Sequence, residues 1–178
     1  MEDALVSGLD SLSPPDSHYV NAAWGWLELD NITEAFRELD RLSNPAQLHP
    51  DVLTLRWELL ARKKQWDDAL NVAHGLVQIA PDRADSWIKQ SFALHELKRT
   101  QEAWDSLISV SEHFPGVSTV PYNLACYACQ LGQESVAIAW LKNAMKIGGR
   151  EDIRRMALSD TDLKPLWAQI KKLSTRAS

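Results

Sequence analysis

The sequence predicts an all-α protein made of four repeated pairs of antiparallel helices. Alanine recurs at a constant interval of 34 residues: Ala35, Ala69, Ala103 and Ala137. A fixed period of this length is typical of stacked helix pairs, in which each unit buries its apolar face against the next. Within one unit, Trp87, Ser91 and Leu94 have the spacing of one helical stripe, and a second stripe follows, which indicates two helices per unit.

The period divides the chain into six parts: an N-terminal segment (1–15), four repeats (16–49, 50–83, 84–117 and 118–151) and a C-terminal part (152–178). In the N-terminal segment, Leu5, Leu9 and Leu12 have helical spacing before the Pro14–Pro15 break. So short a helix is only marginally stable by itself. We therefore expect this segment to be mobile or to pack into a groove of the protein.

Each repeat contains a short polar turn between its two helices, at 29–31, 63–65, 98–100 and 131–133. A connection this short joins antiparallel neighbours. In the first turn, Asn31 and Glu34 form a variant of the capping box, which starts a helix. The second helices are expected to end near helix breakers: Pro45, Pro81, Pro115 and Gly148–Gly149.

The C-terminal part carries the apolar stripe of one amphipathic helix, with Pro165 tolerated in its first turn. The residues of the stripe are Leu163, Leu166, Trp167, Ile170 and Leu173. Because the last unit of a repeat array has no neighbour to cover its apolar face, the sequence predicts that this helix caps the fourth repeat.

A helix–turn–helix unit of 34 residues, with this alanine and a proline at its end, resembles the tetratricopeptide-repeat (TPR) family. The resemblance is closest in 84–117 and in 118–151, where Tyr122, Gly132 and Ala144 also match, and weaker in 16–49. It implies a TPR-type α-solenoid, a right-handed superhelix of antiparallel helix pairs, here with a C-terminal capping helix. It also implies that the first helices of the repeats line a concave groove.

The resemblance places thirteen residues in this groove: Val20, Trp24, Leu27, Glu28, Thr54, Glu58, Arg62, Ile88, Phe92, His95, Glu96, Tyr122 and Cys126. This set is largely apolar with acidic residues at its rim, which suits a peptide or amphipathic helix of another protein. The expected function is a scaffold or adaptor that binds a partner protein. No phosphate-binding loop, nucleophile elbow or zinc-protease motif is present, so we expect no enzymatic activity and no cofactor.

Two alternatives remain open at this point. The groove residues could instead be covered by the N-terminal segment or by a second copy of the chain, which would make this a self-associating structural protein, such as a homodimer. His95, Cys126 and Cys129 could also form a soft-metal or thiol site, because His95 precedes Cys129 by one repeat. Zinc prefers four ligands and no second cysteine pair is present, so small buried apolar residues are the favoured interpretation of the cysteines.

Composition excludes several other classes of function. The formal charge of -5 lacks the basic excess that phosphate contacts require, so no nucleic-acid partner is predicted. No stretch approaches the roughly 18 apolar residues of a membrane span. The acidic N-terminus has no apolar signal region, and the two cysteines form no disulfide framework. The sequence therefore predicts a cytoplasmic protein without a membrane partner.

Overall fold

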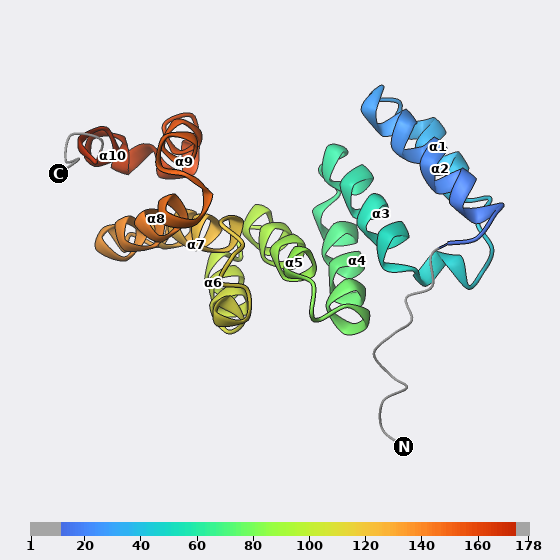
Figure 1. Ribbon diagram of the computed structural model, residues 1–178, viewed down its shortest axis with the longest axis horizontal. Coiled ribbons are helices and arrows are strands. Elements are labelled where there is room, and N and C mark those ends of the chain that lie inside the picture. Colours follow the sequence, from blue (N-terminus) through green and yellow to red (C-terminus); the bar gives the residue numbers. More distant parts are fainter. Residues whose placement is uncertain (1–11, 174–178) are drawn as a thin grey trace, which may run out of the picture. The chain divides into compact units, whose positions relative to one another are not determined.

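The computed structural model describes residues 12–173, which contain helices and turns and no β-strand (Figure 1). The predicted all-α class is confirmed. The chain divides into two compact units, Met1–Ala80 and Pro81–Ser178, which we call unit 1 and unit 2. Leu5 and Leu9, on which a short N-terminal helix was predicted, lie outside the described residues.

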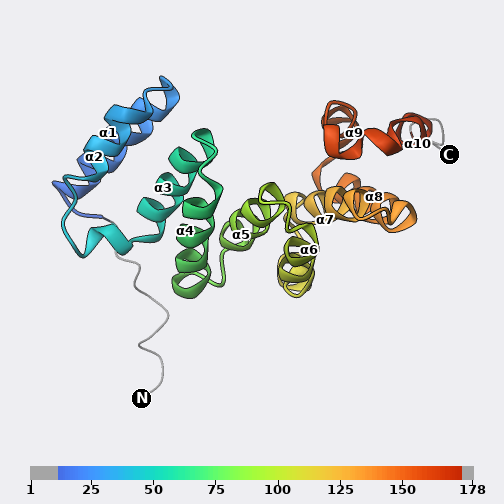
Figure 2. The ribbon, with the colours of Figure 1, turned by 180° about the vertical axis from the view of Figure 1, so that it is seen from behind.

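Unit 1 consists of two helix pairs joined by one 3₁₀ turn. Its elements are α1 (Asp16–Glu28), α2 (Ile32–Leu39), η1 (Ala46–Leu48), α3 (Pro50–Arg62) and α4 (Trp66–Ile79). Helix α1 packs on α2 and α3 packs on α4, as Figures 1 and 2 show from opposite sides. Helix α2 ends at Leu39, well before Pro45. The loop beyond it is held at Ser43, whose backbone N–H and hydroxyl donate to the Asp16 carboxylate at 2.8 and 2.6 Å.

Unit 2 contains two further helix pairs and a C-terminal cap. Its elements are α5 (Ala84–Glu96), α6 (Thr100–Ile108), η2 (Ser111–His113), α7 (Thr119–Gln130), α8 (Glu134–Gly148), α9 (Arg150–Ala157), η3 (Thr161–Leu166) and α10 (Trp167–Lys172). Helix α5 pairs with α6, and α7 pairs with α8. In both pairs a short turn joins the first helix to the second, and the elements of unit 2 can be followed in Figure 2.

The predicted C-terminal helix is divided in the structure. Leu163 and Leu166 lie in η3 and Ile170 lies in α10, and all three are 0% exposed. Pro165 has no backbone N–H to donate, so a regular α-helix does not continue through this segment. The Asp160 carboxylate accepts from the Asp162 backbone N–H at 2.9 Å and starts η3 as a separate element. Three of the five stripe residues are therefore fully buried, Trp167 and Leu173 are half-buried, and the stripe runs over two short helices in place of one.

The alanine column is buried in the second helix of every pair, where a small side chain allows the two helices to pack closely. Ala35, Ala69, Ala103 and Ala137 are all 0% exposed. Four residues later the column Leu39, Ala73, Leu107 and Leu141 is also 0% exposed. One face of each second helix is therefore fully buried at the same height in all four pairs.

The four turns share one backbone conformation. Asp30, Lys64, Lys98 and Gly132 follow one another at the repeat interval, and each has a positive φ, of 56°, 56°, 65° and 75°. The residue after each donates its N–H to a carbonyl five residues earlier, as Arg99 does to Leu94 at 2.9 Å and Gln133 to Ala128 at 2.8 Å. This is the Schellman arrangement that ends a helix. Three of the four positions lack the glycine that this conformation favours.

The alanine column provides a stability test within helix α8. We expect Ala137→Leu to lower the free energy of unfolding by about 1–3 kcal/mol, because the added atoms overpack a fully buried crossing. Ala139→Leu, at an exposed position of the same helix, makes the same chemical change and should have little effect. Urea unfolding followed by circular dichroism measures both. Equal effects of the two substitutions would contradict the close crossing at Ala137.

The left-handed turns provide a second test. A Cβ atom at Gly132 or at Gly116 would meet no atom within 4 Å, so substitution at either site adds no clash. Of these two glycines, only Gly132 has a positive φ. We expect Gly132→Ala to destabilise the protein by about 1 kcal/mol through backbone strain, whereas Gly116→Ala should be neutral or slightly stabilising. The same urea titration measures both, and a neutral Gly132→Ala variant would show that the turn adopts another conformation.

Candidate functional site

The candidate site is the set of predicted groove residues on the first helix of each pair, which we call the inner helices: α1, α3, α5 and α7. On α1, Val20 and Leu27 are 6% and 5% exposed and belong to the core of unit 1. Trp24 is half-buried and packs against the same core. Glu28, at the end of the helix, is exposed. The apolar predicted residues of α1 therefore support the core of unit 1.

On α3 the predicted residues are more polar. Thr54 and Glu58 are half-buried, and Arg62 is exposed. The Arg62 guanidinium forms an ion pair with Asp30, at 3.2 Å, which links the end of α3 to the turn after α1. An exposed pair of this kind contributes little to stability, but it orients the side chain.

On α5 the predicted residues form one stripe along the helix. Ile88, Phe92 and Glu96 are spaced four residues apart, which places them on the same face. Ile88 and Glu96 are half-buried, while Phe92 is 36% exposed. The adjacent Lys89 is buried, and its ammonium group lies 2.9 Å from the Asp85 carboxylate. Helix α5 thus presents an apolar side chain with an acidic group one turn away.

On α7 the predicted residues are covered by the C-terminal segment of the same chain. Tyr122 and Cys126 are 6% and 5% exposed. The Tyr122 hydroxyl donates to Asp160 Oδ2 at 2.8 Å, and the Cys126 thiol donates to the same oxygen at 3.6 Å. Element η3, which follows directly, packs along α7. The sequence predicted that the C-terminal part caps the fourth repeat, but it did not indicate that this part covers the predicted groove residues of α7.

His95, at the end of α5, is also held by the C-terminal segment. Its Nε2 lies 3.0 Å from Asp162 Oδ2, and its Nδ1 lies 3.0 Å from the Thr100 hydroxyl. The Gln130 side chain donates to the backbone carbonyl of Asp162 at 2.7 Å. The only local signal for this arrangement is the pair of aspartates ahead of the capping stripe. It does not indicate which surface they contact.

The cysteines lie in surroundings that suppress their reactivity. Burial, and then the nearby carboxylates of Asp160 and Asp162, raise the pKa of the Cys126 thiol far above its ordinary value. Burial also raises the pKa of Cys129. Thiols that stay protonated are poor nucleophiles and poor metal ligands. Among residues 12–173, no group of three or more His, Cys, Asp and Glu side chains is placed to hold a metal ion, so the soft-metal alternative gains no support.

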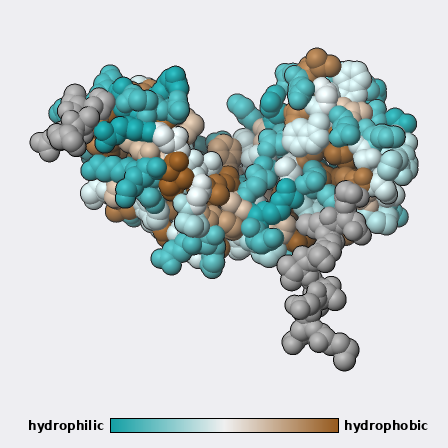
Figure 3. All heavy atoms as spheres, viewed as in Figure 1, coloured by the Kyte–Doolittle hydropathy of each residue, from teal (hydrophilic) through white to brown (hydrophobic). Residues whose placement is uncertain are grey.

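The face of the molecule seen in Figure 3 is mostly hydrophilic, with hydrophobic residues between. In the described part of the chain, every helix is too short or too polar to cross a membrane.

The raised thiol pKa leads to a prediction about pH. The folded chain binds the Cys126 proton more tightly than the unfolded chain does. The free energy of unfolding should therefore fall as pH rises above about 8.5, where an unfolded thiol begins to ionise. Cys126→Ser removes one of the two thiols with a raised pKa and should reduce this pH dependence, which thermal melts across the alkaline range would measure. Rapid reaction of Cys126 with a disulfide reagent in the folded wild type near pH 8.5 would contradict the buried placement.

No family model matches the chain, and no curated protein sequence matches it either. Solved structures do match. A TPR protein of Thermus thermophilus, TTC0263, aligns with a TM-score of 0.69 at 17% identity, over 89% of this chain and 84% of that one. MamA from Desulfovibrio magneticus aligns with a TM-score of 0.67 at 16% identity, over 93% of this chain and 100% of that one.

A further MamA structure aligns with a TM-score of 0.69 at 14% identity, covering 88% of this chain and 86% of that one. At such low identity the likeness concerns the fold, and each match spans nearly the whole of both chains. The repeat interval, the buried alanine column and these structural neighbours agree: the chain has the fold of the tetratricopeptide-repeat proteins.

Proposed function

We propose that the chain is a non-catalytic protein-binding module that holds a peptide or amphipathic helix of a partner protein against α5. The proposed binding surface is the stripe of Ile88, Phe92 and Glu96, which we call the inner face of α5. The observation that carries the proposal is Phe92, a large aromatic residue that stays 36% exposed on an inner helix of a TPR-type fold. Aromatic side chains in such positions are common anchors of protein interfaces.

The other predicted groove residues explain why α5 is favoured over its neighbours. Val20 and Leu27 pack into the core of unit 1, and Trp24 packs against it. Tyr122 and Cys126 are covered by the C-terminal segment. Ile88, Phe92 and Glu96 retain exposure along one continuous stripe. A bound segment would place an apolar side chain against Ile88 and Phe92.

Charge suggests the chemistry of the ligand. Glu96 gives α5 an acidic group at its C-terminal end, one turn beyond Phe92. Opposite charge across an interface favours encounter and correct register. The proposed ligand is therefore an apolar segment flanked by lysine or arginine.

The experiment is a selection of binding peptides from a random display library, with the full chain as target. We expect selected peptides to combine apolar and basic residues and to bind Phe92→Ala at least about tenfold more weakly, the loss typical of an interface anchor. Leu48→Ala is the matched control, because Leu48 is an exposed apolar residue outside the inner helices. Circular dichroism should show equal helicity in all three proteins.

Two results would count against the proposal. Peptides that bind wild type and Phe92→Ala equally would place the binding surface elsewhere. A chain that selects no peptide at all would indicate that the inner helices are already covered by other parts of the protein.

Glu96→Lys tests the charge of the ligand. If Glu96 contacts the basic residues of the bound peptide, this substitution should change the selected flanking residues from basic to acidic.

A further inference from the structure

Unit 2 carries a basic hollow on the side of its cap. It has a volume of about 420 Å³ and is lined by Lys142, Met145, Lys146, Arg150 and Leu173. The lining comes from the last turns of α8, the first residue of α9 and the residue after α10. Met145 is 7% exposed and Leu173 is half-buried, so the floor is apolar, while the three cationic residues are exposed. The hollow falls within the range of 300–1,000 Å³ that is usual for ligand sites.

The positive charge of this hollow exceeds what helix electrostatics explains. Lys142 and Lys146 form no ion pair with any described carboxylate. Lys146 lies near the C-terminus of α8, where the macrodipole favours a cation, but Arg150 lies at the N-terminus of α9, where the macrodipole disfavours one. No acidic residue lines the hollow.

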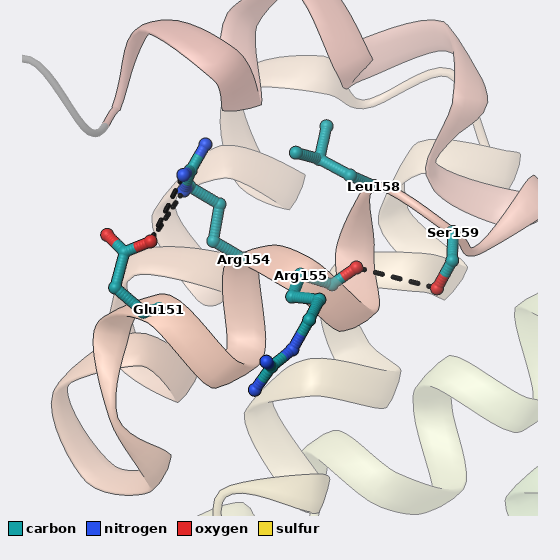
Figure 4. Close-up of a pocket in the computed structure, with 5 residues that line it drawn as sticks. All are labelled: Glu151, Arg154, Arg155, Leu158 and Ser159. Atoms are coloured by element: carbon teal, nitrogen blue, oxygen red, sulfur yellow. Dashed lines mark hydrogen bonds and ion pairs between the residues drawn. The ribbon is translucent and has the colours of Figure 1, made fainter.

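A second hollow in unit 2 shows the contrasting case. It has a volume of about 370 Å³ and lies against α9 and the turn after it (Figure 4). Its two arginines are paired within their own helix, Arg154 with Glu151 at 3.0 Å and Arg155 with Asp152. Both guanidinium groups already have carboxylate partners, so this second hollow is a weaker candidate for binding an anionic ligand.

The chain itself contains a segment whose chemistry complements the basic hollow. Residues 1–11 include three carboxylates, Glu2, Asp3 and Asp10, and a set of apolar side chains between them: Leu5, Val6 and Leu9. The two halves of the chain also differ in net charge: the N-terminal half is acidic and the C-terminal half is slightly basic. Residues 1–80 contain 6 Lys and Arg against 13 Asp and Glu, a formal charge of -7, whereas residues 81–178 contain 13 against 11, a formal charge of +2.

We propose that the basic hollow of one molecule binds the acidic segment 1–11 of a second molecule, so that copies of the chain associate head to tail. Opposite charges bring the acidic end of one copy to the basic hollow of another, whereas like ends repel. The apolar floor of Met145 and Leu173 receives leucine side chains, and the ammonium groups of Lys142 and Lys146 pair with the carboxylates. This surface is separate from the inner face of α5 and does not depend on the proposed function.

The test is a charge exchange followed by sedimentation equilibrium of the full chain. We expect wild type to associate in a concentration-dependent manner that weakens with added salt, because exposed charges are screened. Lys142→Glu/Lys146→Glu should weaken association at least about tenfold, and so should Glu2→Lys/Asp3→Lys, because each juxtaposes like charges. Lys63→Glu/Lys64→Glu, an equal charge change in the turn after α3, is the control and should not do so.

Mixing the two reversed variants is the decisive measurement. Alone, each variant is expected to associate only weakly. Together they should form a mixed complex, because the acidic segment of one meets the unaltered hollow of the other and the two altered sites are again complementary. The proposal is overturned if wild type is monomeric at all concentrations, if the reversals leave association unchanged, or if the mixture does not associate. The peptide selection at α5 is unaffected by any of these results, so the two proposals fail independently.

Discussion

The close approach of two helices at a buried alanine is the constraint on which the rest of the structure depends. Ala35, Ala69, Ala103 and Ala137 have no exposed surface, and each lies in the second helix of its pair. A small side chain at this point lets the pair close, so the residues one turn later, three of them leucines, are buried as well. Because that face of each second helix is buried within the pair, any other segment must pack on the remaining faces of the two helices.

The cap of unit 2 contributes more than coverage of an apolar end. Leu163, Leu166 and Ile170 are fully buried. Asp160 and Asp162 satisfy polar groups of α7 and α5. Tyr122 and Cys126 donate to one carboxylate oxygen, and a half-satisfied arrangement of such buried groups would be costly. The same contacts hold Cys126 as a protonated thiol. The C-terminal segment covers the predicted groove residues of α7, whereas Phe92 on α5 remains 36% exposed.

The two proposed surfaces differ in chemistry as well as in position. The α5 stripe is apolar with an acidic group, which suits a basic-flanked ligand. The hollow beside the cap is apolar with three cations, which suits an acidic ligand. A segment that fits one surface is repelled by the other. A chain of this kind could therefore join copies of itself and a different partner without competition between them.

The sequence by itself determined the features that depend on local spacing. The interval of 34 residues located the helix pairs, the buried alanines and the turns, because helical periodicity and helix breakers act over a few residues. It did not reveal that Asp30, Lys64 and Lys98 adopt the left-handed conformation, since none of them is glycine. Helix closure at the repeat interval requires that conformation whichever residue is present.

Only the tertiary structure decided what covers the inner helices. The bond between His95 and Asp162 joins residues 67 positions apart, and that between Tyr122 and Asp160 joins residues 38 apart. Such contacts depend on where the cap folds back, and this in turn depends on Pro165 and on the burial of Leu163 and Leu166. A pattern of neighbouring residues shows which side chains belong to one face of a helix. Which of those faces remains exposed is settled when distant segments pack against it.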